Sequence, residues 1–236
     1  MNESLASPAQ FLHFPRPERN LTLPVDVKIC GIRTPETLRA AVDGGARAIG
    51  FVFYPPSPRA IATEAAANLV RMMPSGVSAV GLFVDASDEQ IQAVTARVPL
   101  EMLQLHGEES PRRVAEIRGR FALKVMRAIR VATAADLSVL SAYEAAADWI
   151  LFDAKPPRNV TALPGGTGIA FDWRLLDGVK PARPWMLSGG LDAGNLAEAV
   201  DATGTRMVDV STGVEDRPGV KSVERIAAFL AAAKAL

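Results

Sequence analysis

The stretch Val25-Asp-Val-Lys-Ile-Cys-Gly-Ile-Arg-Thr-Pro-Glu36 predicts a short strand, a glycine turn and the start of a helix. Alternating apolar residues indicate the strand, and Thr34 followed by Pro35 is typical of a helix amino terminus. Cys30, the single cysteine of the chain, ends the strand. Its thiol is either a reactive group facing a loop or an inert buried side chain, and this stretch leaves both interpretations open.

The same strand-then-helix unit recurs to the end of the chain. Further β-rich runs are expected at residues 48–53, 78–84, 102–105, 123–128, 149–152, 185–187 and 207–210. The helical stretches between and after them include residues 132–146 and 192–200. Strands that alternate with helical segments imply crossover connections and a parallel sheet. Eight such units in 236 residues match an α/β fold with a single (β/α)8 TIM barrel, which takes about 250 residues. An open doubly wound sheet is the alternative, but its Gly-x-Gly-x-x-Gly turn is missing after the first strand.

We expect one domain over residues 25–236, preceded by a flexible amino-terminal extension over residues 1–24. The extension carries prolines and mixed charges and lacks the apolar core of a secretion signal. No run approaches the roughly 18 apolar residues of a membrane helix. With 26 basic and 26 acidic side chains, the chain has no general attraction for nucleic acid or membranes. A single cysteine cannot form an internal disulfide, which favours a reducing, cytoplasmic location.

Strand alternation places polar side chains inside the barrel at the carboxyl ends of three strands. If Cys30 faces inward, Lys28 does so too, and Gln104 shares its parity with His106. Asp153 has the inward parity of its own strand. Apolar residues take the opposite parity in all three strands. Active sites of this fold lie at the carboxyl end of the barrel, so these side chains are candidate site residues.

Two glycine turns follow the seventh and eighth expected strands. In this fold the loops after those strands commonly hold phosphate, because glycine lets backbone N–H groups approach it closely. The net charge is zero, so any phosphate must be held by such a local site. We therefore expect phosphate contacts from Ser188, Gly189, Gly190, Ser211, Thr212 and Gly213.

Several candidates also have a plain structural interpretation. Asp153 can cap the turn that follows it, and His106 can be a hydrogen-bonding loop residue. Arg59, after three prolines, can be a solvated charge. Glu108 and Glu109 are expected to form a solvated helix start. The second histidine lies in the extension, so the sequence gives no support for a histidine metal cluster.

Eight motifs, taken in chain order, carry a resemblance to a known family. They are Lys28-Ile-Cys-Gly-Ile-Arg, Gly50-Phe-Val-Phe-Tyr, Ser57-Pro-Arg, Gln104-Leu-His-Gly, Leu151-Phe-Asp, Gly165-Gly-Thr-Gly, Leu187-Ser-Gly-Gly-Leu and Val208-Asp-Val-Ser-Thr-Gly-Val-Glu. From about residue 25 to its end, the chain resembles phosphoribosylanthranilate isomerase. The resemblance implies a barrel enzyme of tryptophan biosynthesis, which converts N-(5'-phosphoribosyl)anthranilate to 1-(2-carboxyphenylamino)-1-deoxyribulose 5-phosphate by an Amadori rearrangement.

The resemblance also implies roles for individual residues. Cys30 becomes the general base and Asp153 the general acid, while Gly166 joins the phosphate site. The residues expected to contact the rest of the substrate are Arg59, Lys28, Gln104, His106 and Asp209.

The chemistry sets further expectations. The thiol of Cys30 acts as a base only when ionised, and Lys28 is the neighbouring cation expected to promote its ionisation. No metal or other cofactor is implied, because the iminium nitrogen of the substrate is the electron sink. The expected partner is the phosphorylated aminosugar substrate, and the chain itself is expected to be a monomer or a homodimer.

Two other kinds of function stay open at this level. The first is another enzyme with a related phosphosugar-binding barrel. If it were an indole-glycerol-phosphate synthase, it would be expected to use lysines at strand ends. A ribulose-phosphate epimerase would instead use a metal-binding histidine set. The other is a barrel that binds a phosphorylated ligand as a sensor or scaffold. Such a protein would keep the glycine loops but would not need Cys30 and Asp153 together.

Overall fold

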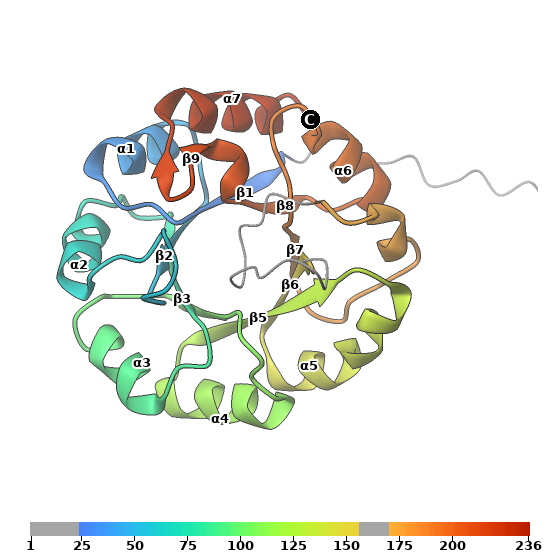
Figure 1. Cartoon of the computed structure of the whole chain (residues 1–236), viewed down its shortest axis with the longest axis horizontal. Coiled ribbons are helices and arrows are strands. Elements are labelled where there is room, and N and C mark those ends of the chain that lie inside the picture. The colour runs from blue at the N-terminus through green and yellow to red at the C-terminus, as the bar shows by residue number, and fades with distance from the viewer. Residues whose placement is uncertain (1–23, 156–169) are drawn as a thin grey trace, which may run out of the picture.

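The computed structural model describes residues 24–155 and 170–236, which form a closed barrel of eight parallel strands. The strands follow one another in sequence order, and β8 pairs with β1 to close the ring. Helices surround the strands on all sides (Figure 1). The predicted (β/α)8 architecture is therefore confirmed. Of the predicted extension, residues 1–23 lie outside the described residues, as does Gly166.

The elements have the following bounds. The barrel strands are β1 Asp26–Cys30, β2 Ala48–Val52, β3 Ser78–Phe83, β4 Met102–Leu105, β5 Lys124–Val131, β6 Trp149–Ala154, β7 Trp185–Leu187 and β8 Met207–Val210. The α-helices are α1 Pro35–Asp43, α2 Thr63–Arg71, α3 Asp88–Thr95, α4 Pro111–Phe121, α5 Leu140–Ala146, α6 Leu196–Thr203 and α7 Val223–Lys234. Three short 3-10 helices are η1 Ala134–Val139, η2 Trp173–Leu176 and η3 Thr212–Val214.

Local sequence determines where the helices begin. Thr34 Oγ1 accepts the backbone N–H of Thr37 at 3.3 Å at the start of α1. Ser110 Oγ accepts from Arg113 N at 3.2 Å in the same way at the start of α4. Each cap satisfies an N–H group that has no partner within the helix. The predicted cap at Thr34 is confirmed.

Two helical segments differ from the prediction. The helix expected over residues 132–146 is divided into η1 and α5. The helix expected over residues 192–200 begins only at Leu196. There the Asp192 carboxylate accepts the backbone N–H of Asn195 at 3.0 Å and holds a turn. Short acidic side chains compete with the helix for backbone groups in this way.

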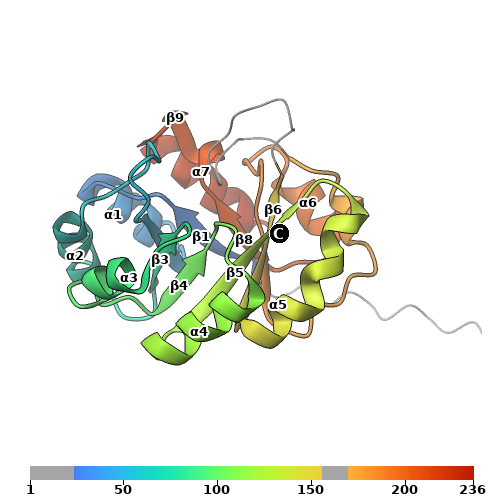
Figure 2. The same cartoon turned by 60° about the horizontal axis from the view of Figure 1, so that its bottom comes forward.

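A hairpin after β8 was not predicted. It consists of β9 Glu215–Arg217 and β10 Val220–Lys221, with Gly219 in the left-handed region at φ 80°. Figure 2 shows it beyond the ends of the barrel strands, beside α7. Its strands have only three and two residues, too short for an alternating pattern to reveal them.

Apolar side chains form two separate layers, because alternate residues of each strand point to opposite faces of the sheet. The layer between strands and helices includes Val27, Ile29, Leu103, Leu105, Ile150 and Phe152. The barrel interior is filled by Ala48, Val80, Met102, Met126, Ala128, Leu151 and Met186. The predicted inward parity of the polar residues on β1, β4 and β6 is thus confirmed. In the described ranges, no helix combines the length and apolar character needed to cross a bilayer.

A buried ion pair fixes the loop between β4 and α4. Arg127 donates from Nη1 to Glu109 Oε2 at 2.7 Å and from Nη2 to the Gly107 carbonyl at 3.0 Å. Glu109 also accepts the backbone N–H groups of Asp85 and Gly107, each at 2.9 Å. This network fixes the backbone at Gly107, the residue that follows His106 in the chain. The prediction that Glu109 is a solvated helix start is therefore wrong.

Glu108 and Glu109 form a matched pair for testing this loop, since the side chain of Glu108 is 81% exposed and that of Glu109 only 2%. Glu109→Gln places an amide N–H₂ against backbone and guanidinium donors. We expect it to lower the free energy of unfolding by about 3–5 kcal/mol, whereas Glu108→Gln changes it by less than about 1 kcal/mol. Urea denaturation followed by circular dichroism measures both. Equal effects would show that the buried pair does not hold the loop.

Candidate active site

Cys30 lies at the inner carboxyl end of β1 and is 4% exposed. Gly50 on β2 makes room for it, since a Cβ there would lie 2.8 Å from the sulfur and 3.2 Å from Lys28 Nζ. Lys28 Nζ in turn donates to Asp209 Oδ1 at 2.8 Å. The cation expected beside the thiol is therefore present, but a carboxylate shares it.

Burial raises the pKa of the Cys30 thiol above that of an ordinary cysteine. The ammonium groups of Lys28 and Lys221 favour the thiolate and oppose this effect, while Asp209 adds to it. Burial by itself lowers the pKa of Lys28, but attraction to Asp209 and Cys30 outweighs burial and raises it. The expectation that the site lowers the pKa of the thiol is therefore wrong, because burial outweighs the nearby cations.

Asp153, at the inner end of β6, ends a line of three buried polar side chains. Its Oδ2 lies 2.9 Å from His106 Nε2, and its Oδ1 accepts the Ala154 N–H at 2.9 Å. On the other side of the ring, His106 Nδ1 lies 3.0 Å from Gln104 Nε2. The structure thus brings together two strands whose polar residues the sequence placed at the barrel mouth. Asp153 therefore contacts His106 on another strand as well as the backbone of the turn that follows it.

Arg59, in the loop between β2 and α2, is buried, so its interpretation as a solvated charge is wrong. Its Nε and Nη2 donate to the two carboxylate oxygens of Glu215, each at 2.8 Å. Lys221 Nζ donates to Glu215 Oε1 at 2.8 Å and to Ser211 Oγ at 3.1 Å. Burial by itself raises the pKa of Glu215, but Arg59 and Lys221 outweigh burial and lower it. Glu215 is therefore an ionised carboxylate between two cations.

Lys221 is a site residue that the sequence does not reveal. It lies on the unpredicted strand β10, and its side chain is buried within reach of Cys30's charge. Burial lowers the pKa of Lys221, although attraction to Glu215 and Cys30 acts against this. The one signal in the sequence is Pro218-Gly219, a pair typical of turns, which indicates that the chain folds back after β8.

The two glycine turns meet at the mouth, as predicted. A Cβ on Gly189, whose φ is 89°, would lie 2.5 Å from the Ala154 nitrogen. A Cβ on Gly213 would lie 2.0 Å from the Leu191 carbonyl oxygen. Only glycine fits at either position. A small cavity of 20 Å³ is lined by all six residues predicted from these turns, Ser188, Gly189, Gly190, Ser211, Thr212 and Gly213.

An adjoining cavity of 30 Å³ gathers the candidate acid–base groups. Lys28 is absent from its lining and lies behind it, paired with Asp209. The described parts of the chain contain no group of three or more histidine, cysteine or acidic side chains arranged to hold a metal ion. The polar and charged side chains that line the cavity are Cys30, Arg59, Gln104, His106, Asp153 and Asp209, together with the hydroxyl groups of Tyr54, Ser57, Ser188 and Ser211.

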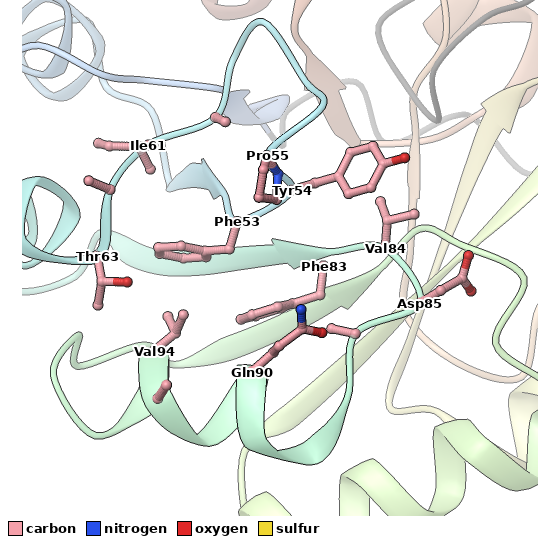
Figure 3. Close-up of a pocket in the computed structure, with 14 residues that line it drawn as sticks. Phe53, Tyr54, Pro55, Ile61, Thr63, Phe83, Val84, Asp85, Gln90 and Val94 are labelled. Carbon is pink, nitrogen blue, oxygen red and sulfur yellow. The ribbon is translucent and has the colours of Figure 1, made fainter.

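A roomier cavity of 680 Å³ lies outside the barrel mouth, beside α3 (Figure 3). Phe53 and Phe83 stack on its floor with ring centroids 5.4 Å apart. Tyr54 points the other way from Phe53 and also lines the mouth cavity. Because the lining is mostly apolar and brings no acid and base together, we place the chemistry in the smaller cavity at the strand ends.

Comparison with known proteins identifies the family. Residues 27–232 match the family described as N-(5'phosphoribosyl)anthranilate (PRA) isomerase. The N-(5'-phosphoribosyl)anthranilate isomerases of Rhodospirillum centenum and Cereibacter sphaeroides are 59% and 55% identical, over 91% and 89% of this chain and 100% and 99% of their own lengths. Phosphoribosyl anthranilate isomerase from Thermotoga maritima has a TM-score of 0.80 and 38% identity, covering 90% of this chain and 100% of its own. The chain therefore belongs to the N-(5'-phosphoribosyl)anthranilate isomerase family.

Proposed function

We propose that this isomerase of tryptophan biosynthesis converts N-(5'-phosphoribosyl)anthranilate to 1-(2-carboxyphenylamino)-1-deoxyribulose 5-phosphate, with Asp153 as general acid and Cys30 as general base. The observation that carries the proposal is that the two residues, on β6 and β1, line one cavity together with Arg59. The reaction needs an acid and a base on different sides of a bound sugar. A related structure with 37% identity and a TM-score of 0.78 is a complex with the reduced form of this product.

The first step opens the furanose ring. Asp153 gives its proton to the ring oxygen, the C1–O bond breaks, and the nitrogen lone pair forms an iminium with C1. The carboxylate that remains on Asp153 accepts the Ala154 N–H on Oδ1, and its Oδ2 lies 2.9 Å from His106 Nε2. Both contacts are in place before the charge develops, so little reorganisation is needed to stabilise it.

The second step moves a proton from C2. The Cys30 thiolate takes it, the electrons of the C–H bond form a C1–C2 double bond, and the iminium becomes a neutral enolamine. Tautomerisation of the enolamine then gives the ketone. Burial opposes the thiolate in the free protein. The iminium brings a positive charge next to the thiol, and a nearby cation favours the ionised form. The thiol therefore gives its own proton to water when the iminium forms, and the thiolate then takes the proton from C2.

The ends of the substrate are anchored by its two anionic groups. Arg59 lines the mouth cavity, and its positive charge attracts the substrate carboxylate, while Glu215 holds the Nε–Nη2 edge and Thr212 Oγ1 accepts from Nη2 at 3.3 Å. Val52, Leu82 and Tyr54 provide apolar surface near Cys30 for the aromatic ring. The glycine turns after β7 and β8 hold the phosphate. Fixing both ends places C1 and C2 between acid and base.

Turnover is tested by the loss of anthranilate fluorescence from freshly prepared phosphoribosylanthranilate. Cys30→Ser and Asp153→Asn should each lower kcat by about 10²- to 10⁴-fold, because each removes one proton transfer. Both should still bind the reduced product. Alkylation should abolish wild-type activity through the single cysteine. Wild-type protein that binds the reduced product without changing the fluorescence would favour a sensor or scaffold, and full activity in either variant would remove that residue from the mechanism.

The state of the thiol is measured by ultraviolet absorption of the thiolate during a pH titration, with Cys30→Ser as the blank. We expect a midpoint above that of free cysteine, because burial raises the pKa of Cys30. Lys221→Met should move the midpoint further up by removing a favourable cation. Lys124→Met, at the exposed amino end of β5, should leave it unchanged. A wild-type midpoint below that of free cysteine would contradict this account of the site.

The role of Arg59 is tested with the substrate and with an analogue that lacks the carboxylate. Arg59→Ala should raise KM for the substrate about 10- to 100-fold, as expected for a charge-assisted hydrogen bond. Glu215 keeps Lys221 as its partner in this variant. For the analogue, the variant and wild type should have similar KM values. An equal loss for both compounds would show that Arg59 supports the hairpin rather than the ligand.

A further inference from the structure

We propose that Gln104 is a positioning residue that holds His106 as its neutral Nε2–H tautomer, so that His106 orients the Asp153 carboxyl toward the reacting oxygen. The statement about the tautomer depends only on the contacts among these side chains. The statement about the reacting oxygen rests on the proposed function. These two parts can therefore fail separately.

The three side chains form one fixed line between β4 and β6. Gln104 Nε2 lies 3.0 Å from His106 Nδ1, and His106 Nε2 lies 2.9 Å from Asp153 Oδ2. Gln104, His106 and Asp153 are 0%, 3% and 4% exposed, so water does not compete for these bonds. Hydrogen bonds between groups so well shielded from water determine which nitrogen carries the proton.

The amide orientation follows from the surroundings of Gln104. With Nε2 facing the ring, the other atom of the amide, Oε1, is buried and has no hydrogen-bond partner among the described residues. The reverse orientation would leave the N–H₂ group in that position instead. An unpaired buried donor is rarer in proteins than an unpaired carbonyl oxygen. We therefore take Gln104 as the donor and His106 Nδ1 as the acceptor.

This orientation determines the proton on His106. Because Nδ1 accepts the amide N–H, the ring proton must be on Nε2, which then donates to Asp153. A doubly protonated ring would place a donor against the amide donor, so Gln104 also disfavours the charged form. With His106 on one oxygen and the Ala154 N–H on the other, the carboxyl cannot rotate freely.

Gln104 also lines the mouth cavity. Its unpartnered Oε1 has no donor among the described side chains, and a hydroxyl of a bound sugar is the kind of donor that would satisfy it. The Gln104 amide thus makes two kinds of contact. Its nitrogen donates to His106, and its oxygen accepts a hydrogen bond from the ligand.

The tautomer is read directly from the ¹⁵N chemical shifts of the imidazole nitrogens in labelled full-length protein. The chain has two histidines, so His13→Gln leaves the signals of His106 alone. We expect the pattern of a neutral ring with Nε2 protonated and Nδ1 bare at neutral pH. A ring protonated on Nδ1, whether neutral or charged, would overturn the proposal. This result does not depend on whether the protein turns over substrate.

Two variants of nearly equal size connect the tautomer to catalysis. Gln104→Glu supplies an acceptor in place of the donor, so it should move the proton to Nδ1 or charge the ring, and lower kcat by about 100-fold or more. Gln104→Met supplies neither a donor nor an acceptor. It should leave a mixture of His106 tautomers and a smaller loss of kcat. Binding of the reduced product should weaken more in Gln104→Met, which loses the oxygen that accepts from the ligand, than in Gln104→Glu, which keeps an oxygen at that position. A normal kcat in Gln104→Glu with altered ¹⁵N shifts would show that the tautomer does not control Asp153.

Discussion

The buried ion pair between Lys28 and Asp209 joins the first strand of the barrel to the last. The two residues are register partners across the seam where β1 meets β8, and Nζ lies 2.8 Å from Oδ1. Each is nearly inaccessible to solvent, so removing one partner would leave an unpaired buried charge at a cost of about 3–5 kcal/mol. The pair lies next to Cys30, and therefore the same contact that closes the sheet also sets the charge around the thiol.

Charge at the barrel mouth is balanced within a few ångströms. Asp209 neutralises Lys28, and Glu215 lies between Arg59 and Lys221. Because each cation has a carboxylate partner, the positive charge at the barrel mouth does not ionise the buried thiol of Cys30. Burial raises the pKa of Cys30, and in the mechanism that we propose the positive charge of the iminium opposes this effect. Gln104 and His106 on β4 lie in line with Asp153 on β6, the residue that we propose as the general acid.

Sequence reasoning reaches the side chains whose position follows from strand alternation. The inward parity of Cys30, Gln104 and Asp153 comes from the apolar residues between them, and the glycine turns follow from strand order. It does not reach contacts that join distant segments. The burial of Arg59 depends on a hairpin of five strand residues, and the partner of Glu109 comes from β5. The direction of the thiol pKa shift depends on how deeply Cys30 is buried, which no local pattern records.

The assignment of acid and base to separate steps is tested most directly with substrate carrying deuterium at C2. If Cys30 removes that proton, the residual turnover of Cys30→Ser should show a larger isotope effect on kcat than wild type, because proton abstraction then limits the rate. If Asp153 opens the ring, Asp153→Asn should show an effect close to unity, because ring opening then limits the rate. The opposite pattern, with a large effect in Asp153→Asn and none in Cys30→Ser, would contradict the account.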